Sequence, residues 1–133
     1  MCLYFRLKRS TVENTQKFTF KNLNCKAKVL SVYDGDTVQL AIPFKGTFFE
    51  NIFNVKCRLV EINAPEMKGI EKERGIKSRD YLSNLILNKI VTVECGAYEK
   101  YGRLLVTIYH NGININKDLV KNGFAKNYLY KII

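Results

Sequence analysis

The stretch VYDGDTVQL, residues 32–40, places two aspartates on either side of one glycine. Asp34 and Asp36 are two positions apart, so a regular strand would direct both carboxylates to one face, although Gly35 could bend that relation. Carboxylate oxygens are ligands for hard cations such as calcium, and a short acidic turn can begin such a site without completing it. By itself the pattern is also typical of an ordinary acid-rich turn.

Two further short segments carry side chains that suit a phosphate group. Residues 58–66, RLVEINAPE, and residues 99–103, EKYGR, each combine an arginine with other polar side chains. Arginine can donate two parallel hydrogen bonds to a phosphate, and only six of the 22 basic residues are arginine. Taken singly, each of these side chains is typical of a solvated surface charge. The candidates are Arg58, Asn63, Glu66, Lys100, Tyr101 and Arg103.

The chain as a whole is strongly basic. Its 22 Lys and Arg residues exceed its 12 Asp and Glu residues by 10, and residues 1–24 contribute +4 of that charge, so +6 remains on residues 25–133. Such a surface attracts polyanions, nucleic acid first and anionic membrane second. No apolar run approaches the roughly 18 residues of a membrane span, and residues 1–10 hold too short an apolar segment for a secretory signal. We therefore expect nucleic acid as the partner, no membrane contact and a cytoplasmic, intracellular location.

The four cysteines do not form a metal or redox motif. They lie 23, 32 and 38 positions apart, with no close pair of the kind that a zinc site requires. Without an export signal we expect reduced, mostly buried thiols, although two could pair if a leader had been removed. They are Cys2, Cys25, Cys57 and Cys95.

Local patterns predict one domain built mainly from strands and preceded by a basic arm. The length of 133 residues suits one compact domain. Residues 1–24 form the arm, in which residues 17–23 or 2–7 could add a strand, and residues 25–133 form the domain. Alternating and β-branched segments predict strands at residues 27–33, 37–42, 54–62, 89–95 and 103–110.

Two helices are expected beside these strands. A broad apolar face predicts the main helix from about residue 70 to 88, and a short helix over about 116–122 ends before Gly123. Asn111 and Gly112 predict a hairpin turn, so we assign the lone His110 to a surface turn without a catalytic role. Strands and helices in this order indicate a small β-barrel with helices packed against it.

Taken together and in order, the motifs resemble the staphylococcal nuclease (thermonuclease-like) family. DGDT is followed by RLVEINAPE, a helix, YGR and LVKNGFAKNYLY, and the resemblance covers about residues 26–130. It implies an α+β fold over residues 25–133: an OB-fold five-stranded β-barrel with one main helix and one short C-terminal helix. It also implies calcium-dependent hydrolysis of phosphodiester bonds in DNA and RNA, leaving 3′-phosphates.

The resemblance also implies roles for individual residues. Asp36 matches the carboxylate metal ligand and Asp34 an acid that acts through water, while Asn63 occupies the second ligand position beside the backbone carbonyl of Ala64. Glu66 matches the general base, and Arg58 and Arg103 match the pair that grips the phosphate. The residues that resemble nucleotide contacts are Lys100, Tyr101, Tyr128 and Tyr130, with one residue fewer than in the family before the final tyrosines.

Several positions depart from the family pattern. Asn63 stands where the best-known members carry aspartate, so we expect weaker calcium binding but not its loss. Ala64 replaces a threonine, and Glu61 replaces an apolar residue. Strict strand alternation would place Arg58 and Asn63 on opposite faces, so we expect the strand to break between them. The loop after Glu66 is shorter than in the family.

The hairpin over residues 43–54 is longer than in the family and rich in phenylalanine. These rings suit a core, a dimer contact or a platform for stacked bases, and the first two are favoured. A homodimer could form through this hairpin or through the N-terminal arm. The rings are Phe44, Phe48, Phe49 and Phe53.

Two other functions compete with a nuclease. The first is a catalytically weak or inactive OB-fold module that binds single-stranded nucleic acid. Such a module has no use for Glu66 facing a phosphate, although Asn63 favours it. The second, a basic packaging protein, explains the charge but not the acids. Both DNA and RNA remain candidate substrates.

Overall fold

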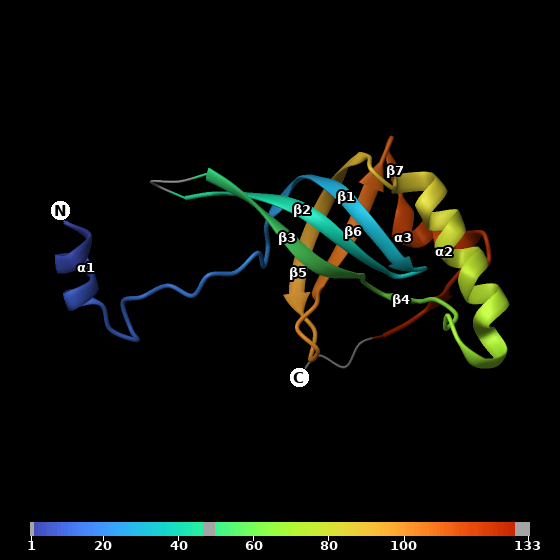
Figure 1. Ribbon diagram of the computed structural model, residues 1–133, viewed down its shortest axis with the longest axis horizontal. Helices are drawn as coiled ribbons and strands as arrows, with labels where there is room; N and C mark the ends of the chain where they lie inside the picture. The colour runs from blue at the N-terminus through green and yellow to red at the C-terminus, as the bar shows by residue number, and fades with distance from the viewer. Residues whose placement is uncertain (1, 47–49, 130–133) are drawn as a thin grey trace.

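The computed structural model describes residues 2–46 and 50–129 (Figure 1). Five strands form its main body: β1 (Asn24–Asp34), β2 (Thr37–Lys45), β3 (Glu50–Leu59), β5 (Ile90–Tyr98) and β6 (Leu104–His110). They are hydrogen-bonded in the order β3-β2-β1-β5-β6, and a parallel pairing of β3 with β6 closes the sheet. The predicted OB-fold five-stranded barrel is confirmed.

The barrel interior is apolar because every second residue of the strands points inward. In β2, for example, Val38, Leu40 and Ile42 are buried, while the residues between them are partly accessible. Most core side chains are β-branched or leucine, which pack well on a pleated sheet. Cys57 and Cys95 are also buried there, and burial raises the pKa of the Cys95 thiol to about 11. Among the described residues the cysteines form no disulfide; Cys25 is half-buried and Cys2 exposed, so only two of the thiols expected to be mostly buried are buried.

Helix α2 (Lys72–Ile86) follows a 3₁₀ turn, Gly69–Glu71, and packs against the barrel (Figure 1). Leu82 and Ile86 are its fully buried contacts with the core. Helix α3 (Ile115–Lys121) is capped by the Asn114 side chain, which accepts a hydrogen bond from the Lys117 N–H. Both predicted helices are confirmed, with α2 beginning two residues later because the chain first makes the 3₁₀ turn.

Three short strands complete the fold. β7 (Ile113–Asn114) pairs with the end of β6 across a turn in which Asn111 and Gly112 have φ of +51° and +76°, so the predicted hairpin is confirmed. β4 (Ile62–Asn63) pairs antiparallel with β8 (Lys126–Asn127), beyond α3. This second pairing brings the C-terminal part of the chain alongside the segment that follows β3.

The N-terminal arm differs from expectation. Residues 17–23 form no strand. Residues 2–7, expected as a possible strand, instead form the N-cap and first part of helix α1 (Leu3–Arg9), which buries no side chain and lies away from the barrel (Figure 1). The alternation of KFTFKNL reflects the burial of one ring: Phe20 is 4% exposed, and its N–H donates to Tyr98 Oη at 3.3 Å. The aromatic cluster that holds the arm comprises Phe18, Phe20, Phe44 and Phe53.

Some expectations fall outside the described residues, namely those on Phe48, Phe49 and Tyr130. In the part of the chain that the structure describes, no helix has the length and apolar character needed to cross a membrane.

Candidate active site

The turn between β1 and β2 lies at one end of the barrel and is closely packed on its outer side. A Cβ atom at Gly35 would lie 2.7 Å from Ala64 Cβ and 2.8 Å from Ser78 Cβ. Real Cβ atoms do not approach so closely, so only glycine fits between the loop after β4 and helix α2. Gly35 therefore allows the turn that carries both aspartates to pack closely against Ala64 and helix α2.

Asp36 is the buried centre of the site, with 4% of its surface exposed. Its Oδ1 forms an ion pair with Arg58 Nη1 at 2.6 Å and accepts a hydrogen bond from the Thr37 hydroxyl at 3.0 Å. Its Oδ2 accepts the backbone N–H of Ala64 at 2.7 Å. A buried carboxylate is stable only when it is paired in this way, and removal of the guanidinium would leave its charge uncompensated.

The strand that carries Arg58 breaks as predicted. β3 ends at Leu59, Glu61 has φ of +67°, and β4 begins at Ile62. The break lets Arg58 Nη2 donate to Asn63 Oδ1 at 3.1 Å, so the two side chains meet despite their spacing of five. Buried Asn116 stabilises the break, because its Nδ2 donates to the carbonyl oxygens of Val60 and Val106.

Arg103 reaches the same region from the loop between β5 and β6. Its guanidinium makes two hydrogen bonds to Glu99, Nε to Oε1 at 3.1 Å and Nη2 to Oε2 at 3.2 Å. Its Nη1 donates to Thr37 Oγ1 at 3.4 Å, and Thr37 in turn donates to Asp36. A continuous line of polar contacts therefore joins the two arginines that the sequence placed 45 positions apart.

The sequence interpretation missed Glu99 and Thr37, which orient Arg103. Glu99 stands four residues before Arg103 in EKYGR, a spacing that could have indicated the pair, and Thr37 is the last residue of DGDT. Burial opposes ionisation of Glu99, but the hydrogen bonds from Arg103 outweigh it and lower its pKa. The hydrogen bonds to Glu99 raise the pKa of Arg103, so this guanidinium stays charged.

The two aspartates have opposite electrostatic environments. Burial and the charge of Asp36 raise the pKa of Asp34 to about 6. Burial would also raise the pKa of Asp36, but the hydrogen bonds from Asp34 and the Ala64 N–H, together with the Arg58 charge, lower it. Asp34 Oδ1 also accepts the Asp36 N–H at 3.0 Å. As pH rises, Asp36 therefore ionises first and Asp34 only near pH 6, and a nearby cation would favour ionisation of Asp34 at lower pH.

The residues at the turn suit a hard cation in ligand chemistry but provide little charge for it. The candidate metal ligands are oxygens of Asp36, Asn63 and Ala64, and Asp34 would act through a water molecule. Calcium binds carboxylate, amide and carbonyl oxygens of this kind. Over residues 2–46 and 50–129, no three His, Cys, Asp or Glu side chains converge on a common point. Asn63 and a backbone carbonyl would therefore have to supply what carboxylates do not.

Glu66 lies at the rim of this cluster. It follows β4 by three residues and is exposed, and its backbone N–H donates to Glu71 Oε2 at 3.1 Å. Among the described residues, no hydrogen bond joins its carboxylate to Asp36 or to either arginine. The structure therefore brings together most of the predicted site and leaves the expected general base beside it.

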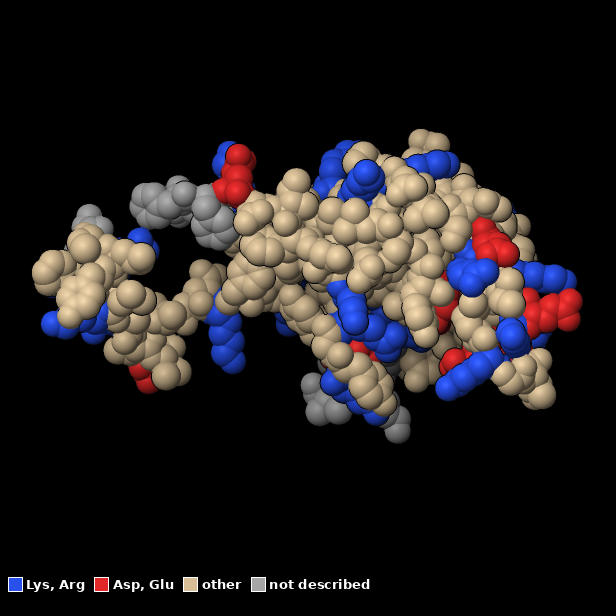
Figure 2. Space-filling model, in the orientation of Figure 1, with Lys and Arg blue, Asp and Glu red and all other residues tan. Residues whose placement is uncertain are grey.

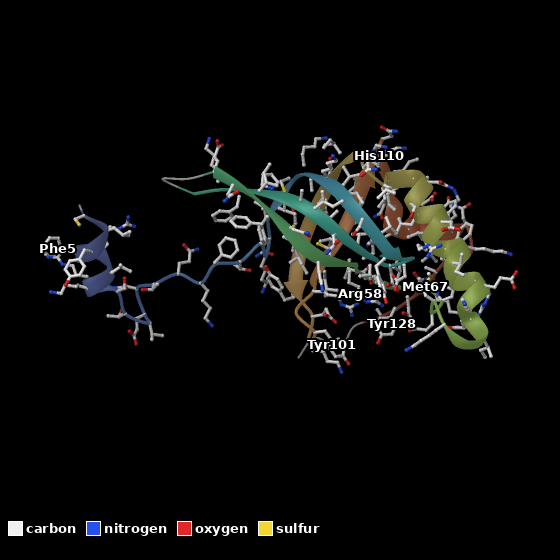
Figure 3. All side chains as sticks on the ribbon, viewed as in Figure 1. Phe5, Arg58, Met67, Tyr101, His110 and Tyr128 are labelled. Atoms are coloured by element: carbon white, nitrogen blue, oxygen red, sulfur yellow. The ribbon has the colours of Figure 1, made fainter. Side chains whose placement is uncertain are left out.

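Of the predicted nucleotide contacts, Lys100 and Tyr101 lie beside Arg103, and Tyr128 lies beside the β3–β4 break. Tyr101 is exposed, with Lys100 Nζ 4.9 Å and Arg103 Cζ 5.9 Å from its ring centroid. Tyr128 is also exposed, and its N–H donates to the Glu61 carbonyl at 2.8 Å, which fixes the C-terminal segment beside the β3–β4 break. Figure 3 places both tyrosines and Arg58 toward the lower edge of the barrel, where Figure 2 shows a group of Lys and Arg side chains.

The lone histidine lies elsewhere. His110 ends β6 and is labelled on the opposite side of the barrel from Arg58 in Figure 3. It pairs with Ile113 across the hairpin turn, a position that gives it no contact with the cluster around Asp36.

Comparison with known proteins identifies relatives of this chain. The family described as staphylococcal nuclease homologue matches residues 56–132, more than half of the chain. Endonuclease YhcR of Bacillus subtilis is 38% identical over 109 residues, which cover 73% of this chain and 8% of that protein. A protein named uncharacterized endonuclease in Escherichia coli O157:H7 is 35% identical, and the match covers 74% of this chain and 58% of that protein. A protein of the same name in Haemophilus influenzae is 36% identical, and the match covers 76% of this chain and 51% of that protein. The chain thus spans about half of these two relatives and a small part of the first.

Proposed function

This chain belongs to the staphylococcal nuclease family, and on that premise we propose that it hydrolyses phosphodiester bonds in DNA, RNA or both in a calcium-dependent reaction. The endonuclease names of its relatives support a nucleic-acid hydrolase. The basic surface, with a formal net charge of +10, would draw the polyanion to the protein.

One observation carries the proposal: two arginines are held beside one buried carboxylate. Arg58 is fixed by Asp36 and Asn63, and Arg103 by Glu99 and Thr37, so neither guanidinium has to be ordered when a phosphate arrives. Guanidinium groups match phosphate oxygens in geometry and charge. Donors oriented in advance stabilise charge that develops during the reaction, and loss of one such donor typically costs about 3 to 4 kcal/mol.

The remaining roles follow from residue chemistry. Asp36, Asn63 Oδ1 and the Ala64 carbonyl would hold calcium, with Asp34 behind them. When bound, the ion supplies positive charge that polarises the phosphate. The Glu66 carboxylate would accept a proton from the attacking water, while Arg58 and Arg103 bind the phosphate oxygens. Cleavage of the bond to the 5′ oxygen leaves a 3′-phosphate.

Digestion assays test this proposal. Single-stranded DNA, duplex DNA and RNA are incubated with calcium or with a chelator, using wild type, Glu66→Gln and Glu50→Gln. Glu50 makes an exposed ion pair with Lys45 at the base of the 45–50 hairpin, so its variant has the same charge change away from the site. We expect Glu66→Gln to lower the cleavage rate by about 10² to 10⁴, as for loss of a general base, and Glu50→Gln to match wild type.

Two outcomes would contradict the mechanism. Cleavage that persists in chelator would exclude the role of calcium, and an unchanged rate in Glu66→Gln would exclude Glu66 as the base. Analysis of the product ends tests which P–O bond is cleaved, because 5′-phosphate products would show that the bond to the 3′ oxygen is broken instead.

Asn63→Asp, assayed in the same series, tests the metal ligands. Calcium affinity rises with the number of charged ligands, and aspartate keeps the oxygen that Asn63 presents to Arg58. We expect Asn63→Asp to need less calcium for half-maximal cleavage. A titration of the thermal midpoint with calcium measures the same affinity without activity, and an unchanged or higher calcium requirement in both titrations would contradict the assignment.

A second candidate function is a non-catalytic module that binds single-stranded nucleic acid. The neutral amide of Asn63 and the exposed Tyr101 ring, flanked by Lys100 and Arg103, favour it, because aromatic faces and cations bind unpaired bases. Tight binding of single strands without cleavage under any metal condition, in wild type and in Asn63→Asp, would support this module over the nuclease.

A further inference from the structure

The loop that carries Glu66 is not held in place by burial. Lys68, Gly69 and Ile70, which follow it, are all exposed, and so is the Glu66 side chain. Glu66 and residues 68–71 line one open hollow with Arg74 on the surface. The direction of the Glu66 carboxylate must therefore depend on how its backbone is fixed.

One hydrogen bond fixes the N–H side of Glu66. The carboxylate of Glu71 reaches back over five residues, and its Oε2 accepts the Glu66 N–H at 3.1 Å. The other oxygen, Oε1, accepts from Arg74 Nη2 at 3.1 Å. Arg74 lies one turn later, so the ion pair holds the Glu71 side chain in the rotamer that reaches Glu66.

Helix α2 touches the same residue from the carbonyl side. A Cβ atom at position 75 would lie 2.2 Å from the Glu66 carbonyl oxygen and 2.7 Å from its carbonyl carbon. Only glycine permits this approach. The backbone of Glu66 is therefore held between the Glu71 carboxylate and the surface of α2 at Gly75.

We infer that Glu71 is a positioning residue for the general base: its carboxylate holds the Glu66 backbone so that the Glu66 side chain faces the phosphate site. This inference rests on the proposed nuclease function. Glu71 acts through the Glu66 N–H and through no contact with substrate. A change of about 1 Å in the position of a reacting group can lower a rate by about 10²-fold, so a single backbone hydrogen bond is sufficient to matter.

Three variants isolate this contact. Glu71→Ala removes the acceptor, Glu71→Gln keeps an oxygen in the same place without the charge, and Glu73→Ala removes a neighbouring exposed glutamate. Among the described residues, Glu73 forms only an exposed ion pair, with Lys77 at 3.8 Å, and it lies two residues after Glu71, so it is a matched control for charge and place in the chain.

Steady-state kinetics in calcium and hydrogen exchange of the Glu66 amide are measured for each variant. We expect Glu71→Ala to lower kcat about 10- to 100-fold with KM within about twofold, since the phosphate-binding arginines are untouched. Glu71→Gln restores most of kcat, and Glu73→Ala matches wild type. The Glu66 amide should exchange at least about tenfold faster in Glu71→Ala than in the other two variants.

Equal kcat for Glu71→Ala and wild type, with cleavage intact, would overturn the inference and leave the nuclease proposal standing. An equal loss in Glu71→Ala and Glu73→Ala would also overturn it, because a general effect of charge would then explain the loss. Absence of cleavage in wild type would instead overturn the nuclease proposal and with it this catalytic role. The amide exchange would still report whether Glu71 holds Glu66.

Discussion

Asp34 and Asp36 show how two like residues in one turn acquire different tasks. Burial would raise the pKa of Asp36, but the hydrogen bonds from Asp34 and the Ala64 N–H, together with the Arg58 charge, outweigh it and lower the pKa. Burial and then the charge of Asp36 act on Asp34, and together they raise its pKa to about 6. The second negative charge at the turn therefore forms only as pH rises through about 6.

Asp34→Asn tests this charge balance through protein stability. The folded-state pKa of Asp34, about 6, exceeds the ordinary value of 3.8, so the folded chain binds more protons between these values and stability falls as pH rises from about 4 to 6. Asparagine keeps an oxygen for the Asp36 N–H and does not titrate. With solvent screening allowed for, we expect Asp34→Asn to raise the metal-free free energy of unfolding by about 1 kcal/mol at pH 7.

Urea unfolding of wild type and Asp34→Asn in chelator, at steps from pH 4 to 7, measures this difference. The gain should shrink as pH falls toward 4, because Asp34 is then protonated in the folded chain and nearly half protonated in the unfolded chain. Parallel stability curves across the whole range would show that Asp34 does not carry the raised pKa.

The proximity of the candidate residues was predictable where they belong to ordered motifs, whereas their roles remain predictions. Asp36, Arg58, Asn63 and Arg103 meet in space as the ordered motifs indicated. Glu99 was not identified, because a carboxylate in a charged loop resembles any solvated acid. The bidentate contact with Arg103 identifies it as the partner of that guanidinium.

At the scale of elements, helix α2 and the two segments that it contacts determine the geometry of the site. The β1–β2 turn meets α2 at Ser78, and the loop after β4 meets it at Gly75. Ser78 Oγ also donates to the Phe124 carbonyl at 2.6 Å, and Tyr81 stacks on the Phe124 ring with centroids 4.0 Å apart. The helix therefore connects the acidic turn, the loop of Glu66 and the C-terminal segment.

Gly75→Ala tests the contact between α2 and the loop. In an unconstrained helix interior this substitution stabilises by about 1 kcal/mol, because alanine has the higher helix propensity. Here the new Cβ would meet the Glu66 backbone at 2.2 Å, so we expect a net loss of about 1 to 3 kcal/mol of unfolding free energy.

Denaturant unfolding measures the effect of Gly75→Ala, and Asn84→Ala, at an exposed position of the same helix, is its control. Asn84→Ala should be neutral or slightly stabilising. A gain of stability in both variants would show that α2 does not press on the loop.

Element type was predictable from the periodicity of long segments and failed in the arm. Five barrel strands and two helices follow from alternation and from a broad apolar face. Residues 17–23 alternate as well, but Phe20 is buried in an aromatic cluster and the segment makes only isolated bonds to β5, such as Asn22 N–H to the Cys95 carbonyl at 3.0 Å. A short alternating pattern cannot distinguish a strand from a single anchored side chain.

At the scale of the whole molecule, the arm and the barrel are joined through Phe20. Helix α1 buries none of its side chains, whereas Phe20 belongs to the hydrophobic core. Its ring centroid lies 6.1 Å from that of Phe44 and 6.2 Å from that of Phe53, on the long hairpin. The part of the chain that packs on the barrel therefore begins at about Phe18.

Removal of residues 1–16 and Phe20→Ala test this division of the chain. We expect the truncation to change the unfolding free energy by less than about 0.5 kcal/mol, as for exposed positions. Phe20→Ala should cost about 3 to 5 kcal/mol, the usual range for a buried phenylalanine. Thermal and urea unfolding measure both, and a large loss on truncation would show that α1 contributes to the fold.

The sequence by itself determined the strands, the main helix, the basic surface and the family motifs, because periodicity, charge and short spacings are properties of neighbouring residues. The tertiary structure decided which of these residues meet. The parallel pairing of β3 with β6 places Arg58 at the start of β6, close to Arg103. The β3–β4 break turns Asn63 toward Arg58. The support of Glu66 by Glu71 and Gly75 also depends on close packing, which no local pattern in the sequence records.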